Sequence, residues 1–236
     1  MSAFSESGKL KAVTFSFDDG VTQDIRLIEL LNKYGLKATF NINSGLLGGK
    51  GMLIREGKRI SHYKIHPTDV RAVYDGHEIA AHTLTHPHLP PLEESEIIRQ
   101  VEEDRCRLSE LAGYEVVGMA YPGGGVNNDE RVAEIVKEKT GILYSRTITL
   151  TNSMDRQENL FRFDPTAHYV NFGRMEDYVT RLFADKSGKE QILYIWGHSY
   201  EMDYAPDYWI RLEKFFELVS GREEIFYGTN KEIILP

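Results

Sequence analysis

The 236-residue sequence is poor in cysteine, has no long apolar run and carries no excess of positive charge. Its single cysteine, Cys106, cannot form an intrachain disulfide, so the fold needs no oxidising compartment. No segment reaches the roughly 20 apolar residues of a membrane span, and the first residues lack the apolar run of a signal peptide. We therefore expect a cytoplasmic protein, with Cys106 on the buried face of a helix.

The formal net charge of −8 argues against nucleic acid or an anionic membrane as the main partner. With 236 residues, 41% of them hydrophobic, the chain can bury a sizeable core. Because α/β barrels of this size commonly form one unit, we expect a single domain over residues 1–236.

Short β-branched and aromatic segments alternate with helix-like segments along the chain. The predicted strands are residues 11–17, 38–43, 77–81, 116–121, 141–147, 159–163 and 190–196. The predicted helices are residues 24–34, 67–75, 92–113, 128–139, 174–186 and 206–220. Repeated strand–helix units predict parallel strands joined by crossover helices, and their number favours an α/β barrel over an open sheet.

One insertion, residues 44–66, interrupts this alternation. It is rich in glycine at first and basic later. A loop of about 20 residues often covers a site. We nevertheless interpret it as an irregular, solvated surface loop rather than as a substrate clamp.

Titratable side chains follow three of the predicted strands, at the edge where α/β folds place their active sites. Asp18 and Asp19 follow the first strand, His82 and His86 the third, and His198 the last. Two histidines four residues apart on a helical turn can share a metal, and with one carboxylate they form a recurring ligand set. Adjacent residues leaving a strand point in different directions, so the other aspartate can act as a base.

These residues lie in motifs that resemble those of the polysaccharide deacetylase, or NodB-homology, family of carbohydrate esterases. The similar stretches are "TFSFDDG" at 14–20, "GHEIAAHTLTH" at 76–86, the Pro-Gly turn at 122–123 and "WGH" at 196–198. They follow one another in the family's order. The resemblance implies a distorted (β/α)7-type barrel and a metal-dependent hydrolase that removes acetyl groups from N-acetylated sugars.

The resemblance also implies a role for each motif residue. Asp19, His82 and His86 match the metal ligands, Asp18 the general base and His198 the general acid. In this chemistry, one divalent ion polarises the acyl oxygen and lowers the pKa of a bound water to about 7. Zinc is the first expectation for that ion, although cobalt, nickel, iron and manganese also suit imidazole and carboxylate ligands.

The third motif departs from the family pattern of arginine, any residue, proline and an aromatic residue. Ala120 stands at the arginine position and Gly123 at the aromatic position. We predict that Arg146, near the end of the fifth predicted strand, reaches Asp18 and replaces the missing arginine; a surface arginine is the alternative. The backbone N–H of Gly123 is predicted to face the oxyanion of the reaction.

Several other side chains are weaker candidates. His168 and Tyr200 are candidates for lining the site, and a sugar-stacking surface would extend from Tyr200 to Tyr204, Tyr208 and Trp209. The last two more simply begin a core-facing helix. Four histidines are interpreted as surface or structural residues: His62, His66, His77 and His88.

We therefore expect a metal-dependent deacetylase. The missing export signal, the negative net charge and the insertion favour a small or oligomeric N-acylated sugar, or another small amide, over a polymer. Allantoinase-like hydrolysis of a small amide on the same fold stays open, as does a carbohydrate-binding protein without turnover. A metal-storage or scaffolding role fits less well, because a candidate acid and a candidate base are both present.

Overall fold

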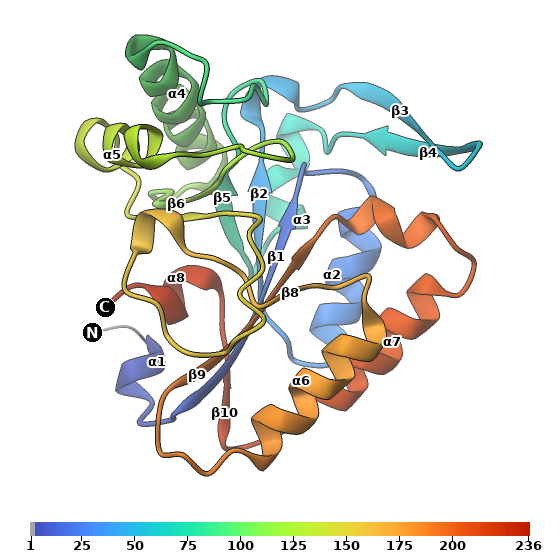
Figure 1. The fold of residues 1–236 in the computed structure, drawn as a ribbon. Coiled ribbons are helices and arrows are strands. Elements are labelled where there is room, and N and C mark those ends of the chain that lie inside the picture. Colours follow the sequence, from blue (N-terminus) through green and yellow to red (C-terminus); the bar gives the residue numbers. More distant parts are fainter. Residues whose placement is uncertain (1–2) are drawn as a thin grey trace.

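A curled, eight-stranded parallel sheet forms the centre of the computed structural model, which describes residues 3–236 (Figure 1). Its strands are β1 (Lys11–Asp18), β2 (Ala38–Ile42), β5 (Glu78–Ala81), β6 (Gly118–Ala120), β7 (Tyr144–Arg146), β8 (Ala167–His168), β9 (Gln191–Gly197) and β10 (Ile225–Tyr227). Seven of them follow the order β7–β6–β5–β2–β1–β9–β8, and β10 pairs with the first half of β1. The carboxyl ends of these strands therefore meet at one rim.

The sheet curls far enough for one chain segment to reach from β7 toward β8. Phe163 forms a parallel bridge with Arg146, and its N–H donates to the Ser145 carbonyl at 2.9 Å. The chain then enters β8, which pairs with β9. The predicted single-domain α/β fold is confirmed as a distorted barrel, in which this segment stands where a regular strand would be.

The strand predicted at residues 159–163 is wrong. Leu160–Arg162 form a 3-10 turn, η3, because the Asn159 side-chain oxygen accepts hydrogen bonds from the N–H groups of Phe161 and Arg162. The sequence pattern also missed β8 and β10. β8 has two residues and β10 three, too few to show an alternating pattern, whereas the equally short β6 and β7 lie within longer predicted stretches.

Helices cover the outside of the sheet (Figure 1). They are α1 (Ala3–Glu6), α2 (Gln23–Lys33), α3 (Val70–Val73), α4 (Glu94–Ala112), α5 (Glu130–Lys139), α6 (Phe172–Ala184), α7 (Tyr208–Val219) and α8 (Asn230–Ile234). The six predicted helices are confirmed to within a few residues at each end. Figure 1 shows α4 beside α5 on one side of the barrel, α6 beside α7 on another, and α1 beside α8 near the two termini.

The longest helix, α4, shows how the sequence pattern positions the core. Ile97, Val101 and Leu108 lie on one stripe and are buried, and Gly113 ends the helix with a left-handed φ of 80°. Cys106 is exposed, so its predicted burial is wrong. It lies two residues before Leu108, a rotation of about 200° that turns it to the solvent face.

The insertion is an ordered hairpin and not an irregular loop. Its strands β3 (Lys50–Arg55) and β4 (Lys58–Tyr63) pair antiparallel, and Figure 1 shows them extending from the rim. Ile60 packs with Val21 and Tyr200, which anchors the hairpin to the barrel. The expectation of a solvated loop therefore needs correction.

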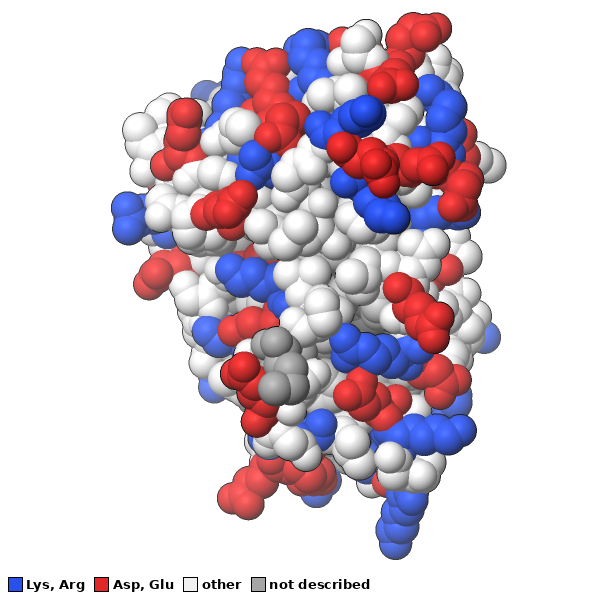
Figure 2. All heavy atoms as spheres, turned by 90° about the vertical axis from the view of Figure 1, so that its left-hand side faces the viewer, with Lys and Arg blue, Asp and Glu red and all other residues white. Residues whose placement is uncertain are grey.

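Charged side chains of both signs are interleaved on the face of the molecule that Figure 2 shows. On α4, for example, Arg99 lies 2.7 Å from Glu96 and 3.3 Å from Glu103. Exposed pairs of this kind add little to stability. Among residues 3–236, no helix combines the length and the apolar character needed to cross a bilayer.

The buried stripe of α4 gives a stability prediction. Leu108→Ala should lower the free energy of unfolding by about 2–5 kcal/mol, because it leaves a cavity at a fully buried position. Leu111→Ala removes the same atoms from a half-buried position and should cost less than half as much. Urea unfolding of both variants measures the difference, and equal losses would contradict the assigned stripe.

Candidate active site

The rim of the barrel gathers polar side chains from five strands. Asp18 ends β1, and Arg146, His168 and His198 lie at or just beyond the ends of β7, β8 and β9. His82 directly follows β5. The structure thus brings together residues that are up to 180 positions apart in the sequence, as parallel strand ends require.

Asp19, His82 and His86 form a compact group of potential ligands. One side-chain ligand atom from each lies within 4.8 Å of the others, and His86 Nε2 is 3.7 Å from Asp19 Oδ1. Burial alone would raise the pKa of Asp19, but the hydrogen bond from His62 and the charge of Lys64 hold it well below its usual range. An ionised carboxylate therefore faces two imidazoles.

The two histidines do not share a helical turn, so that expectation is wrong. They lie in a loop in which Thr83 and His86 have φ values of 67° and 60°. The loop is held by Gln100 of α4, which accepts hydrogen bonds from the N–H groups of Leu84 and Thr85. These contacts replace the hydrogen bonds of a helical turn.

His82 is oriented as a ligand by its hydrogen bonds. Its Nδ1 lies 2.8 Å from the Ala120 carbonyl, which only accepts, so Nδ1 carries the proton and Nε2 keeps its lone pair. Its backbone N–H donates to Asp104 Oδ2 at 3.0 Å. Burial lowers the pKa of His82 to about 4, so the ring is neutral at pH 7. Neutral imidazoles and an ionised carboxylate are a donor set that fits a divalent ion.

Asp18 is a buried carboxylate with a buried counter-charge. Arg146 Nη2 lies 2.5 Å from both of its oxygens, and Asn41 Nδ2 donates to Oδ1 at 2.8 Å. Burial raises the pKa of Asp18, but the charge and the hydrogen bond of Arg146 act against it, and the net shift is downward. Arg146 is 0% exposed, so the surface alternative is wrong.

His198 stands beside a carboxylate, Glu201, that is not among the motif residues. Its Nδ1 lies 3.5 Å from Glu201 Oε2, and His168 Nε2 lies 3.3 Å from the same oxygen. Burial lowers the pKa of His198, but Glu201 reverses this effect and raises it to about 9. One side-chain ligand atom from each of these three residues lies within 4.8 Å of the others, as in the Asp19 group. Because the raised pKa of His198 favours a protonated ring beside the Glu201 carboxylate, we interpret His198 and Glu201 as an ion pair, with His168 as a second neighbour of Glu201.

Three other candidates from the sequence, Tyr200, Gly123 and Trp209, lie in different surroundings. The Tyr200 ring lies 4.9 Å from that of His198 and 5.0 Å from that of His62. Gly123, with a φ of 85°, packs on His88, and a Cβ there would lie 2.7 Å from the His88 ring. Trp209 is buried in α7, as the interpretation of a core-facing helix predicts.

Two further residues of the site, Asp104 and Glu201, have a signal in the sequence. Asp104 falls on the apolar stripe of α4, where a carboxylate must find buried donors, and it accepts from Ser44 and His82. Glu201 follows His198 within one turn, at a position that can cap and pair with it. The Asp104 signal can be read from the predicted stripe, whereas the Glu201 signal depends on the turn after β9, which the structure gives.

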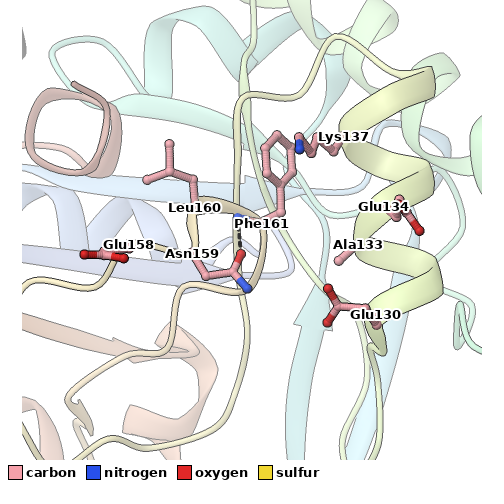
Figure 3. A pocket seen from close by; sticks show the side chains of 8 residues that line it. All are labelled: Glu130, Ala133, Glu134, Lys137, Glu158, Asn159, Leu160 and Phe161. Carbon is pink, nitrogen blue, oxygen red and sulfur yellow. Dashed lines mark hydrogen bonds between the residues drawn. The ribbon is translucent and has the colours of Figure 1, made fainter.

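A surface hollow lies apart from this rim (Figure 3). Its volume is about 340 Å³, and it lies between α5 and the η3 segment, with Leu160 and Phe161 on one side and Glu130 and Glu134 on the other. None of the rim residues described above lines it. The chemistry of the rim is therefore independent of this hollow.

The sequence is similar to a known family of proteins and to several of its members. The sequence profile described as polysaccharide deacetylase matches residues 5–140. The peptidoglycan-N-acetylmuramic acid deacetylase PdaC of Bacillus subtilis is 26% identical over 123 residues, which are 51% of this chain and 23% of PdaC. Most of that relative therefore lies outside the matched stretch.

Two solved structures share the architecture over nearly the whole chain. A family 4 carbohydrate esterase from Streptomyces lividans superposes with a TM-score of 0.60 at 17% identity, covering 95% of each chain. Puue allantoinase gives 0.69 at 14% identity, covering 99% of this chain and 92% of that one. The fold is thus the distorted barrel of NodB-homology carbohydrate esterases. The chain belongs to the polysaccharide deacetylase family.

The ion pair at the rim gives a prediction about protonation. Glu201→Gln should lower the pKa of His198 from about 9 toward its usual 6.5, because the burial remains and the largest raising contribution is lost, while Asp19 and Asp18 still raise it. An NMR titration of the His198 ring measures this shift. Glu217→Gln, an exposed change on α7, should leave it unaltered.

The same shift affects stability. Because the folded pKa of His198 exceeds the usual value, His198 contributes stability in full below about pH 6.5 and loses it as the pH rises through about 9, while Glu201, whose pKa is lowered, contributes in full above about pH 4.5. The difference in unfolding free energy between wild type and Glu201→Gln should therefore shrink from pH 6.5 to pH 10. A difference that is independent of pH would contradict the assignment.

Proposed function

We propose that this chain hydrolyses the amide of an N-acylated sugar, with Asp18 as the general base and His198 as the general acid. Asp19, His82 and His86 would hold one divalent ion, with zinc as the first candidate. The observation that carries the proposal is the position of Asp18. It is ionised, buried and held by Arg146, and its Oδ2 lies 4.0 Å from Nε2 of the ligand candidate His82.

The protein groups are in the protonation states that this reaction needs. A divalent ion bound at the rim would polarise the acyl oxygen and make a water more acidic. Asp18, ionised at neutral pH, can accept a proton from the attacking water. His198, with a pKa of about 9, can donate one to the departing amine. The role of the Gly123 N–H toward the oxyanion stays a prediction.

The substrate class rests on the family and on the surroundings of the rim. PdaC is named for deacetylation of N-acetylmuramic acid in peptidoglycan, which supports an N-acetylated sugar here. Tyr200 and His168 flank His198 and are proposed to contact that sugar. Because the β3–β4 hairpin stands at the rim, we propose a short or oligomeric substrate, and comparing kcat/KM for monomer, tetramer and polymer tests this. The cytoplasmic location stays a prediction.

A direct assay tests the reaction and its acid and base. Acetate release from N-acetylglucosamine oligomers should require an added divalent ion, and Asp18→Asn and His198→Ala should each reduce turnover by ~10²-fold or more. Asp69→Asn, an exposed change, is the control. Full activity in either rim variant would refute its role. Binding of the oligomers without acetate release would favour the carbohydrate-binding alternative, and ammonia or urea release from small amides would favour the allantoinase-like one.

Arg146 is proposed to hold Asp18 in place, as the missing arginine of the third motif would. Arg146→Met should lower kcat by ~10-fold or more, because the buried carboxylate loses its counter-charge. Arg146→Lys should recover part of the rate, since a single nitrogen, Nη2, makes both contacts. Circular dichroism and metal content establish that each variant is folded. A normal rate in Arg146→Met would exclude the replacement.

A further inference from the structure

The end of the β3–β4 hairpin contacts the proposed metal ligand Asp19 through two side chains. His62 Nε2 lies 3.3 Å from Asp19 Oδ2. Lys64 Nζ donates to the Asp19 main-chain carbonyl at 2.6 Å and lies 3.4 Å from Oδ1. His62 and Lys64 are two positions apart in extended chain, so they project from the same face of β4 and its continuation.

The hairpin is fixed in this position by backbone hydrogen bonds. Lys64 forms an antiparallel bridge with Val21, and the N–H of Thr22 donates to the Tyr63 carbonyl at 2.8 Å. The N–H of Ile65 donates to the Gly20 carbonyl at 2.9 Å. Both partners of Asp19 are therefore attached to the loop that carries Asp19 itself.

The two side chains act on different atoms of Asp19. His62 occupies Oδ2, which leaves Oδ1 to face His86 at 3.7 Å. A hydrogen bond to the distal oxygen of a ligating carboxylate fixes its orientation and strengthens metal binding. Only 7% of the Lys64 side chain is exposed, and its nitrogen lies beside Oδ1, the oxygen that faces His86.

Whereas the hydrogen bond from His62 should strengthen metal binding, the positive charge of Lys64 should weaken it. Its ammonium neutralises Asp19 and holds the backbone at a left-handed φ of 84°. A divalent ion on Oδ1 would share that oxygen with a positive charge, and burial leaves little water to screen the repulsion. Lys64 should therefore weaken metal binding although it stabilises the empty site.

We propose that the β3–β4 hairpin sets the metal affinity of the site through Asp19, with His62 strengthening and Lys64 weakening the binding of the ion. Both are positioning residues, since neither needs to touch the ion or the substrate. The inference rests on the proposed function only in that Asp19, His82 and His86 hold a divalent ion. The inference adds a role for the β3–β4 hairpin, which is to set the affinity of the site for the ion.

The experiment is a zinc titration of the metal-free full chain against a chromophoric chelator, which gives Kd without any assay of activity. Lys64→Gln keeps a donor for the Asp19 carbonyl but removes the charge, and it should lower Kd by ~10-fold or more. Lys64→Arg keeps the charge and should leave Kd close to wild type. Lys50→Gln removes an exposed charge from the same hairpin and should change Kd less than twofold.

Variants of His62 should change the Kd for zinc in the opposite direction. His62→Ala should raise Kd by ~10–100-fold, and His62→Gln, which restores an N–H donor, should recover part of the affinity. A purely structural role for the hairpin predicts weaker binding in every variant. Thermal unfolding of the metal-free proteins shows whether each one is folded.

The outcomes separate this inference from the proposed function. Wild-type chain that binds zinc, together with unchanged or weaker binding in Lys64→Gln, overturns the inference and leaves the metal site standing. Wild-type chain that binds no zinc overturns both. If Lys64→Gln does not fold, Lys64→Met provides the same removal of charge, and its Kd decides in the same way.

Discussion

The buried ion pair between Asp18 and Arg146 is the interaction on which the rim depends. The two residues are 2% and 0% exposed, and neither charge would be tolerated there without the other. Asp18 ends β1 and Arg146 ends β7, and three strands separate β1 from β7 in the order of the sheet. The pair therefore spans the mouth of the barrel, and it keeps Asp18 ionised next to His82.

Much of the fold was predictable because its long helices and strands have recognisable hydrophobic patterns in the sequence. The apolar stripe of α4 and the β-branched runs of β1 and β9 have the periods of a helix and of buried strands. The exceptions have physical causes. The pairing of β8 and β10 depends on neighbours distant in the sequence, and η3 depends on the side chain of Asn159. The hydrophobic pattern of the sequence reveals neither the pairing of distant strands nor a turn that is held by one side chain.

The site shows the same division. Asp18, Asp19 and His198 could be placed because they directly follow recognisable strands, and parallel strands end together. The left-handed loop that brings His86 to Asp19 could not be predicted from the sequence, because it is held by hydrogen bonds to Gln100 of α4, a residue outside the loop. Glu201 and Lys64 look like ordinary solvent-facing charges in the sequence, whereas Asp104 falls on the apolar stripe of α4. The contacts of Glu201 and Lys64 depend on the turn after β9 and on the β3–β4 hairpin, which only the structure gives.

The central claim is that Asp19, His82 and His86 hold a divalent ion. Anomalous diffraction at the zinc absorption edge, from crystals grown with zinc, tests it most directly. The account predicts one strong peak about 2.0–2.2 Å from a carboxylate oxygen of Asp19 and from Nε2 of both histidines. A peak between His168, His198 and Glu201 instead, or no peak at the rim, would contradict it.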